Sequence, residues 1–165
     1  MNSLRYNLMY TVGYLRSYIQ PWWSIQPDIS QITENIFISD LATIYNEETL
    51  NEHGITHIIS LILGLKPAYP KKYTYLNIHV QDIPEENINK HFEQSIEFIE
   101  KAIKGEGKIL VHCSCGISRS STIVINYLMH KNNWTLEESL EYVKSKRAIV
   151  EPNEGFKNQL AFKNM

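Results

Sequence analysis

Cysteine is scarce in this sequence: the 165 residues contain two, Cys113 and Cys115, with a single residue between them. Two cysteines so close together cannot form an ordinary structural cross-link, so a fold stapled by disulfides is excluded. A chain of 19.3 kDa can bury enough apolar surface to fold without such a staple. We therefore expect reduced thiols, kept for packing or for chemistry, in a reducing compartment such as the cytoplasm.

Long apolar runs and an excess of positive charge are also missing. No stretch approaches the roughly 18 consecutive apolar residues that a membrane-spanning helix needs. Lys and Arg number 16 against 18 Asp and Glu, which gives a net charge of −2. Nucleic-acid binding requires a basic face, so we expect no nucleic-acid partner.

Aspartate and arginine are rare as well. The chain has three aspartates beside 15 glutamates, and four arginines beside 12 lysines. With its abundant Ile and Asn, this bias resembles coding by an AT-rich genome, so a viral or protist origin fits the composition. One consequence concerns chemistry: Asp82 is the only aspartate after Asp40.

The remaining composition is that of an ordinary soluble domain, with 43% hydrophobic and 21% charged residues. Apolar runs of strand length alternate with segments of helical periodicity. We expect strands at 32–38 (two short strands around a Glu-Asn turn), 57–63, 73–80 and 108–112, and helices at 47–53, 87–104, 120–131, 134–147 and 153–163. This alternation predicts an α/β fold, a central, mostly parallel sheet of about five strands flanked by helices.

Acidic residues are absent from residues 1–23. Five aliphatic side chains recur there at helical spacing and four tyrosines follow a second face: Leu4, Leu8, Val12, Leu15 and Ile19, and Tyr6, Tyr10, Tyr14 and Tyr18. We expect an extra N-terminal helix ending at Pro21, then a linker over 22–30. The chain then divides into an amphipathic helix with its linker (1–27) and a main domain (28–165).

An isolated helix of this length is marginal in water, so something must cover it. Its own domain can cover one face, whereas the second, aromatic face favours another chain and hence a homodimer formed through this helix. A membrane surface is the weaker alternative because Arg5 and Arg16 are the only charged side chains of the segment. An organelle transit peptide is a further alternative.

The chemistry of the sequence is concentrated in the loop from Cys113 to Arg119, which follows a buried strand and opens a helix. Helix N-termini present unpaired N–H groups and the positive end of the dipole, a geometry that binds anions. Gly116 allows the backbone to fold back so that successive N–H groups point inward. A Cys113 thiolate would be stabilised there, and Arg119 can hold two oxygens of an anion. This combination suits attack on a phosphomonoester.

Two other interpretations of the cysteine are open. Cys113 can be a buried packing residue, but packing alone does not account for Gly116 and Arg119 at their offsets. His112, Cys113 and Cys115 can be metal ligands, but their spacing differs from that of the usual zinc pairs. We expect neither a metal nor another cofactor.

These residues resemble the cysteine-based protein phosphatases. The motif H-C-x5-R-S stands here as His112-Cys113-Ser114-Cys115-Gly116-Ile117-Ser118-Arg119-Ser120. Further segments are similar to the small, atypical dual-specificity phosphatases: 30–39, 116–121, 127–129 and 147–153. The resemblance covers about residues 30–162 in continuous order and leaves out 1–27. It implies a fold like that of the protein tyrosine phosphatases.

The resemblance also implies a role for each matching residue. Cys113 would be the nucleophile that becomes phosphocysteine, Ser120 would help the thiolate leave, and His112 would support the thiolate from behind. The phosphoryl group would bind the Arg119 side chain and the backbone amides of the loop, those of Ser114, Cys115, Gly116, Ile117, Ser118 and Arg119.

A leaving oxygen must also be protonated by an acid. The family's acid is an aspartate on the loop before the long helix, and Asp82 in Val80-Gln81-Asp82-Ile83-Pro84 matches that place. An aspartate before Pro84 can instead form a turn or a cap, and then Glu85 or Glu86 would be the acid. Asn153 matches an asparagine that supports the loop.

The expected substrate is a phosphoresidue of a protein. Phosphoinositide phosphatases carry basic residues within this loop, whereas Ser114, Cys115, Ile117 and Ser118 are uncharged, and RNA 5′ ends would require a basic surface. No insertion deepens the site, so analogy with the family implies action on phosphotyrosine and on phosphoserine or phosphothreonine. The alternatives are a phosphatase of phosphoinositides or RNA 5′ ends, and a pseudophosphatase that only binds phosphoresidues.

Overall fold

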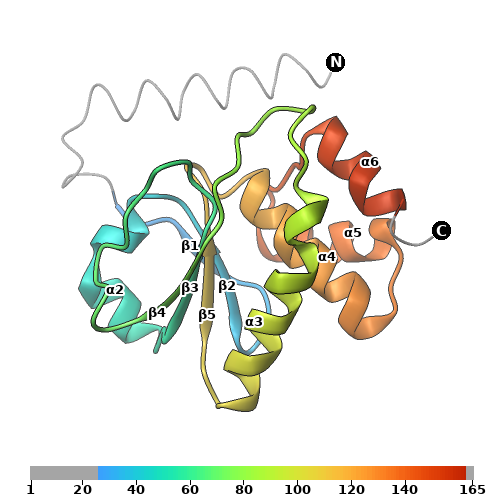
Figure 1. Cartoon of the computed structure of the whole chain (residues 1–165). Coiled ribbons are helices and arrows are strands. Elements are labelled where there is room, and N and C mark those ends of the chain that lie inside the picture. The colour runs from blue at the N-terminus through green and yellow to red at the C-terminus, as the bar shows by residue number, and fades with distance from the viewer. Residues whose placement is uncertain (1–25, 163–165) are drawn as a thin grey trace.

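The computed structural model describes residues 26–162, and their centre is a five-stranded sheet (Figure 1). Its strands are β1 (Ile29–Gln31), β2 (Ile36–Ser39), β3 (His57–Ser60), β4 (Thr74–Asn77) and β5 (Ile109–His112), in the spatial order β1-β2-β5-β3-β4. β1 pairs antiparallel with β2, and the other neighbours are parallel. The expected α/β fold with a mostly parallel sheet is therefore confirmed.

The central strands β2, β3 and β5 are apolar on both faces, as a parallel sheet covered on both sides requires. Successive side chains of a strand point to opposite faces, so each strand contributes to two cores. The larger core contains Ile36, Ile38, Ile59, Ile109 and Val111, and the smaller contains Phe37, Ile58 and Leu110.

Helices cover both faces of the sheet (Figure 1). The short helix α2 (Glu47–Glu52) follows the 3-10 turn η2 (Thr43–Tyr45) and packs on the smaller core through Leu50. On the other face lie α3 (Phe92–Lys104), preceded by the 3-10 turn η3 (Asn89–His91), α4 (Arg119–Asn132), α5 (Leu136–Lys146) and α6 (Glu154–Phe162). Every residue of α4 from Arg119 to Met129 is buried, so α4 is the central helix of this layer.

Local sequence signals account for the ends of these elements. A capping box opens α5: the Thr135 side chain accepts from the Glu138 N–H, and the Glu138 carboxylate accepts from the Thr135 N–H. α3 buries an apolar face that includes Phe92, Ile96 and Ile99.

Several boundaries differ from the expectation. β1 occupies the end of the segment predicted as a linker over 22–30, because Ile29–Gln31 finds a partner strand in β2. Ile32 and Thr33, predicted as strand, form the turn instead, and both of their N–H groups donate to the Ile36 carbonyl. The predicted strands 57–63 and 73–80 pair only over His57–Ser60 and Thr74–Asn77. The predicted N-terminal helix lies outside the described residues.

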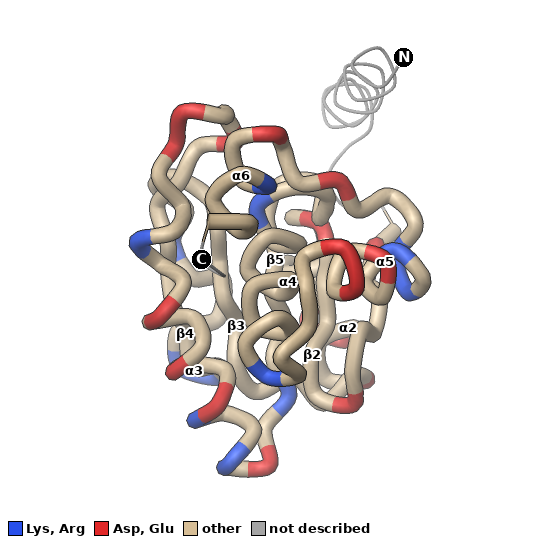
Figure 2. The backbone as a smooth tube through the Cα atoms, turned by 90° about the vertical axis from the view of Figure 1, so that its right-hand side faces the viewer, with Lys and Arg blue, Asp and Glu red and all other residues tan. Residues whose placement is uncertain are grey.

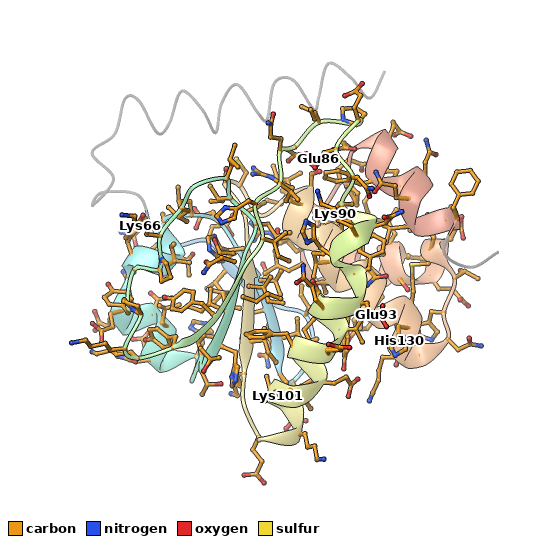
Figure 3. All side chains as sticks on the ribbon, viewed as in Figure 1. Lys66, Glu86, Lys90, Glu93, Lys101 and His130 are labelled. Atoms are coloured by element: carbon orange, nitrogen blue, oxygen red, sulfur yellow. The ribbon has the colours of Figure 1, made fainter. Side chains whose placement is uncertain are left out.

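The carboxyl ends of β3, β4 and β5 meet at one edge of the sheet, the upper edge in Figure 1. Glu86, on the segment before α3, lies at the same upper end of the molecule, whereas Lys101 lies near the opposite end of α3 (Figure 3). Ligands of parallel α/β sheets bind beyond the carboxyl ends of the strands. Among the described residues, no helix is long and apolar enough to span a membrane.

Candidate active site

The loop between β5 and α4 places Cys113 directly after the last residue of a fully buried strand. Cys113 is 1% exposed, and its Sγ lies 3.3 Å from the Oγ of Ser120 in the first turn of α4. Ser120 is itself fully buried. The predicted nucleophile and the hydroxyl predicted to assist it are thus in contact.

Four carbonyl groups of the loop are bound from outside it. The Ser114 carbonyl accepts from the Leu41 N–H at 3.1 Å, and the Ile117 carbonyl accepts from the Glu151 N–H at 3.0 Å. The carbonyls of Cys115 and Gly116 accept from the Arg147 guanidinium at 3.3 and 2.9 Å. In a trans peptide the N–H points opposite to the C=O, and no peptide bond described is cis.

It follows that the N–H groups of the next residues along the chain, 115–118, point away from those outer partners and into the loop. This arrangement is the predicted anion nest, and it lies at the N-terminus of α4. The loop therefore has the donors that an oxyanion requires.

Gly116 has no room for a side chain. Its φ is +66°, a left-handed conformation that glycine adopts without strain, and a Cβ would lie 2.7 Å from the Ser39 carbonyl oxygen and 2.8 Å from the Arg147 Nη2. The predicted need for glycine at this position thus has two independent causes.

The Arg119 guanidinium is fixed on three sides. Nη1 donates to the Leu61 carbonyl at 3.0 Å, Nη2 donates to the Ser114 Oγ at 2.9 Å, and Nε lies 3.4 Å from the Asp82 Oδ2. Only 8% of its side chain is exposed. A guanidinium held in this way offers a planar, pre-oriented cation to an anion in the loop.

Asp82 reaches the same loop from the segment before α3. Its Oδ1 accepts from the Ser118 hydroxyl at 2.7 Å and from the Asn153 amide at 3.0 Å, and its side chain is 6% exposed. The two alternative acids are directed elsewhere: Glu85 is exposed, and Glu86 accepts from the Gln81 N–H. Asp82 is therefore the carboxylate that the fold brings to the loop.

His112 lies behind the loop and is completely buried. Its Nδ1 is 3.4 Å from the Cys113 carbonyl oxygen, and burial lowers the pKa of its imidazole to about 4. A neutral imidazole cannot stabilise a thiolate by charge. Any support that His112 gives to Cys113 passes through this backbone contact.

Cys115 differs from Cys113 in its surroundings. Burial, and after it the neighbouring Cys113, raises the pKa of the Cys115 thiol to about 11, so this sulfur is a neutral thiol near pH 7. Within residues 26–162, no group of three or more His, Cys, Asp or Glu side chains is arranged to hold a metal ion.

Sequence reasoning missed Arg147 and its partners. Asp28 and Ser30 lie in the segment predicted as a linker over 22–30, but both accept hydrogen bonds from Arg147, which also donates to the loop. The contact joins positions 119 residues apart. Two signals could have pointed to Arg147: arginine is rare in this chain, and Arg147 opens the segment 147–153 that resembles the family.

Comparison with known proteins places this geometry in a family. Residues 36–165 match the family model described as dual specificity phosphatase, catalytic domain. The chain is 38% identical over 131 residues to dual specificity protein phosphatase 1 of Arabidopsis thaliana, and 44% identical over 132 residues to MAP kinase phosphatase with leucine-rich repeats protein 3 of Dictyostelium discoideum. Each alignment covers 79% of this chain, which spans 66% of the first protein and 15% of the second.

A comparison with solved structures supports the same family. The human tyrosine phosphatase-like serine/threonine/tyrosine-interacting protein superposes with a TM-score of 0.80 at 32% identity, over 82% of this chain and 95% of its own. The family match begins at Ile36, the first residue of β2, and includes the loop, Asp82 and Arg147. The chain therefore belongs to the dual specificity phosphatase family.

Proposed function

We propose that this chain hydrolyses phosphate esters of tyrosine and of serine or threonine in proteins, through a phosphocysteine intermediate on Cys113. The observation that carries the proposal is the meeting of a cysteine, an oriented guanidinium and a carboxylate around a loop whose N–H groups point inward. Membership of the dual specificity phosphatase family supports the same activity.

In the first step the Cys113 thiolate attacks phosphorus, and an S–P bond forms as the P–O bond to the side chain breaks. Asp82, entering the step as the acid, gives its proton to the leaving oxygen. The loop amides and Arg119 hold the three remaining phosphoryl oxygens, where charge is greatest during transfer. The products of this step are the dephosphorylated side chain and phosphocysteine.

In the second step water attacks the phosphorus of phosphocysteine. The Asp82 carboxylate accepts a proton from the water, a P–O bond forms and the S–P bond breaks. Ser120 Oγ, 3.3 Å from Sγ, can donate a hydrogen bond to the departing thiolate while keeping its proton. Inorganic phosphate is released, and both Asp82 and Cys113 return to their starting forms.

Charge supports a protein substrate over a polyanion. The loop residues between Cys113 and Arg119 are uncharged, and Lys and Arg are scattered along the backbone among Asp and Glu instead of gathering into a stripe (Figure 2). Phosphoinositides and RNA 5′ ends carry several phosphates and bind best to concentrated positive charge. We therefore place phosphoproteins before both alternatives.

The deciding experiment compares phosphotyrosine and phosphothreonine peptides of one sequence with a phosphoinositide and a triphosphorylated RNA. The proposal expects release of phosphate from both peptides and little from the other two substrates. Cys113→Ser should abolish release, while Cys115→Ser, which removes the neutral neighbouring thiol, should retain most of it. Preferred turnover of the phosphoinositide or the RNA would contradict the proposal.

A phospho-binding pseudophosphatase is the second candidate, because one structural relative bears the name of a phosphatase-like interacting protein. Cys113 and Arg119 are both present and in contact with their expected neighbours, which favours turnover. Tight binding of the peptides by the unaltered chain without release of phosphate would favour the pseudophosphatase.

Two further proposals concern the setting of this activity. A thiolate nucleophile requires reducing conditions, so we place the protein in the cytoplasm. We also retain the homodimer formed through residues 1–27 as a proposal, supported by the aliphatic stripe and tyrosine row of that segment.

A further inference from the structure

Arg147 follows α5 and uses every nitrogen of its guanidinium. Nε donates to the Gly116 carbonyl at 2.9 Å, and Nη2 donates to the Cys115 carbonyl at 3.3 Å. On its other side, Nη1 and Nη2 donate to the two carboxylate oxygens of Asp28, both at 2.8 Å, and Nη1 also donates to the Ser30 hydroxyl at 3.0 Å. Its side chain is 3% exposed.

The two carbonyls that Arg147 holds belong to peptide groups of the phosphate loop. The peptide group of the Cys115 carbonyl carries the Gly116 N–H, and the peptide group of the Gly116 carbonyl carries the Ile117 N–H. Because Arg147 holds the oxygens outside the loop, it directs these two N–H groups inward. The backbone N–H groups of Leu41 and Glu151 do the same for the neighbouring peptides, so Arg147 is the one side chain among these outer donors.

A glycine peptide needs this external hold more than others do. Gly116 has no side chain, and its φ of +66° is one of several conformations open to glycine. Without a donor on the Cys115 and Gly116 carbonyls, both peptides can rotate and turn their N–H groups out of the loop. The cost would appear as weaker anion binding.

Asp28 keeps Arg147 in this position. A buried guanidinium requires a compensating charge, and the bidentate pair with Asp28 supplies it while leaving Nε free to reach Gly116. Asp28 directly precedes β1, and its side chain is 52% exposed. A residue at the start of the domain is thereby connected to the phosphate loop through one intervening side chain.

We infer that Arg147 is a positioning residue of the phosphate loop and that Asp28 keeps the Arg147 side chain in place. This pair sets how tightly the loop binds phosphate, although neither residue touches the phosphate. The inference rests on the proposed function only in taking the loop as the phosphate site. It names a determinant of that site outside the H-C-x5-R-S motif.

The test measures the dissociation constant of inorganic phosphate by titration calorimetry on the full chain, and turnover of a phosphotyrosine peptide separately. Arg147→Lys keeps the positive charge but cannot reach both carbonyls and Asp28 together. We expect it to weaken phosphate binding on the order of 10-fold or more, as loss of a hydrogen bond to a charged group does. Asp28→Asn should weaken binding by several-fold, since the carboxylate's second acceptor oxygen is lost.

Val143→Ala is the matched control for stability. Val143 lies on α5, one turn before Arg147, and its apolar side chain is fully buried in the larger core, where it donates no hydrogen bond to the loop. We expect a lower melting temperature with a phosphate affinity within about twofold of the unaltered chain. Arg147→Lys should therefore lose more affinity than its melting temperature explains.

An unchanged phosphate affinity in Arg147→Lys and Asp28→Asn would overturn the inference. A loss of phosphate affinity in Val143→Ala as large as that in Arg147→Lys, at the same melting temperature, would overturn it too. If Arg147→Lys fails to fold, Asp28→Asn decides alone, because Asp28 is half exposed. Failure of the proposed function has a different signature: the unaltered chain would bind phosphate, with Asp28 and Arg147 affecting affinity as expected, yet release none from peptides.

Discussion

At the scale of single residues, Asp82 is the acid of the proposed mechanism. Ser118, Asn153 and Arg119 hold its carboxylate against the loop that contains Cys113. Asp82 is thus the carboxylate of this segment that contacts the loop, since Glu85 is exposed and Glu86 accepts from the Gln81 N–H.

Asp82→Asn should therefore lower the turnover rate in a way that depends on the leaving group. We expect the rate to fall by a factor on the order of 10²–10⁴ for phenyl phosphate, whose leaving oxygen needs a proton. The loss should be much smaller for an aryl phosphate whose leaving phenol is substantially more acidic. Glu85→Gln serves as the control and should leave both rates unchanged. Equal losses for the two esters would show that Asp82 is structural.

His112 gives a second prediction, about stability against pH. Burial lowers the pKa of its imidazole from 6.5 to about 4, so the folded state resists a proton that the unfolded state accepts. The folded protein should lose stability as the pH falls from about 6.5 toward 4, by at most roughly 3 kcal/mol from this group.

Thermal melts of the unaltered chain and of His112→Asn over this range isolate that contribution, because the other titrating groups are shared. The difference between the two melting temperatures should shrink as the pH falls. A constant difference from pH 7 to pH 4 would mean that His112 does not titrate in this window.

At the scale of elements, α6 contacts the segment that carries Asp82 and fixes its position. Asn153 caps α6 by accepting from the Phe156 N–H and also donates to Asp82. Gln159, on the same helix, accepts from the Ile88 and Asn89 N–H groups. Between them, Gly155 lies so close to Pro84 that a Cβ would be 1.9 Å from the Pro84 carbonyl oxygen.

Gly155→Ala should push this segment away from α6 and displace Asp82 from the loop. We expect turnover of phenyl phosphate to fall about 10- to 100-fold, because small misplacements of a catalytic group are costly, with little change in phosphate affinity. Asn158→Ala, at an exposed position of the same helix, is the control. A larger loss of phosphate affinity than of turnover would place the effect of Gly155 in the loop instead.

The elements also show what the sequence could and could not predict. The loop residues from His112 to Ser120 are contiguous, so their roles follow from one strand, one glycine and one helix start. The contact between Arg147 and Asp28, and the approach of Pro84 to Gly155, join residues far apart in the chain. Such contacts depend on strand order and helix packing, and no local pattern encodes them.

At the scale of the whole molecule, the described residues carry the proposed chemistry, and the proposed homodimer concerns the residues before them. Their aliphatic stripe and tyrosine row predict a contact with a second chain. The chain enters the domain at Asp28, which holds Arg147, so any truncation has to preserve that aspartate.

Removal of residues 1–25 tests the assembly and leaves the whole described domain in place. We expect the full chain to sediment as a dimer at tens of micromolar and the truncated chain as a monomer. A monomeric full chain would contradict the dimer, and binding of that monomer to anionic vesicles would favour a membrane surface instead.

The central claim is that Cys113 accepts the phosphoryl group. Its most direct test is mass spectrometry of acid-quenched enzyme during turnover of a phosphotyrosine peptide, using Ser120→Ala to slow the second step. We predict one added phosphoryl group on the peptide that contains Cys113, and none in Cys113→Ser. Continued turnover by Cys113→Ser, or a phosphoryl group on another residue, would contradict the account.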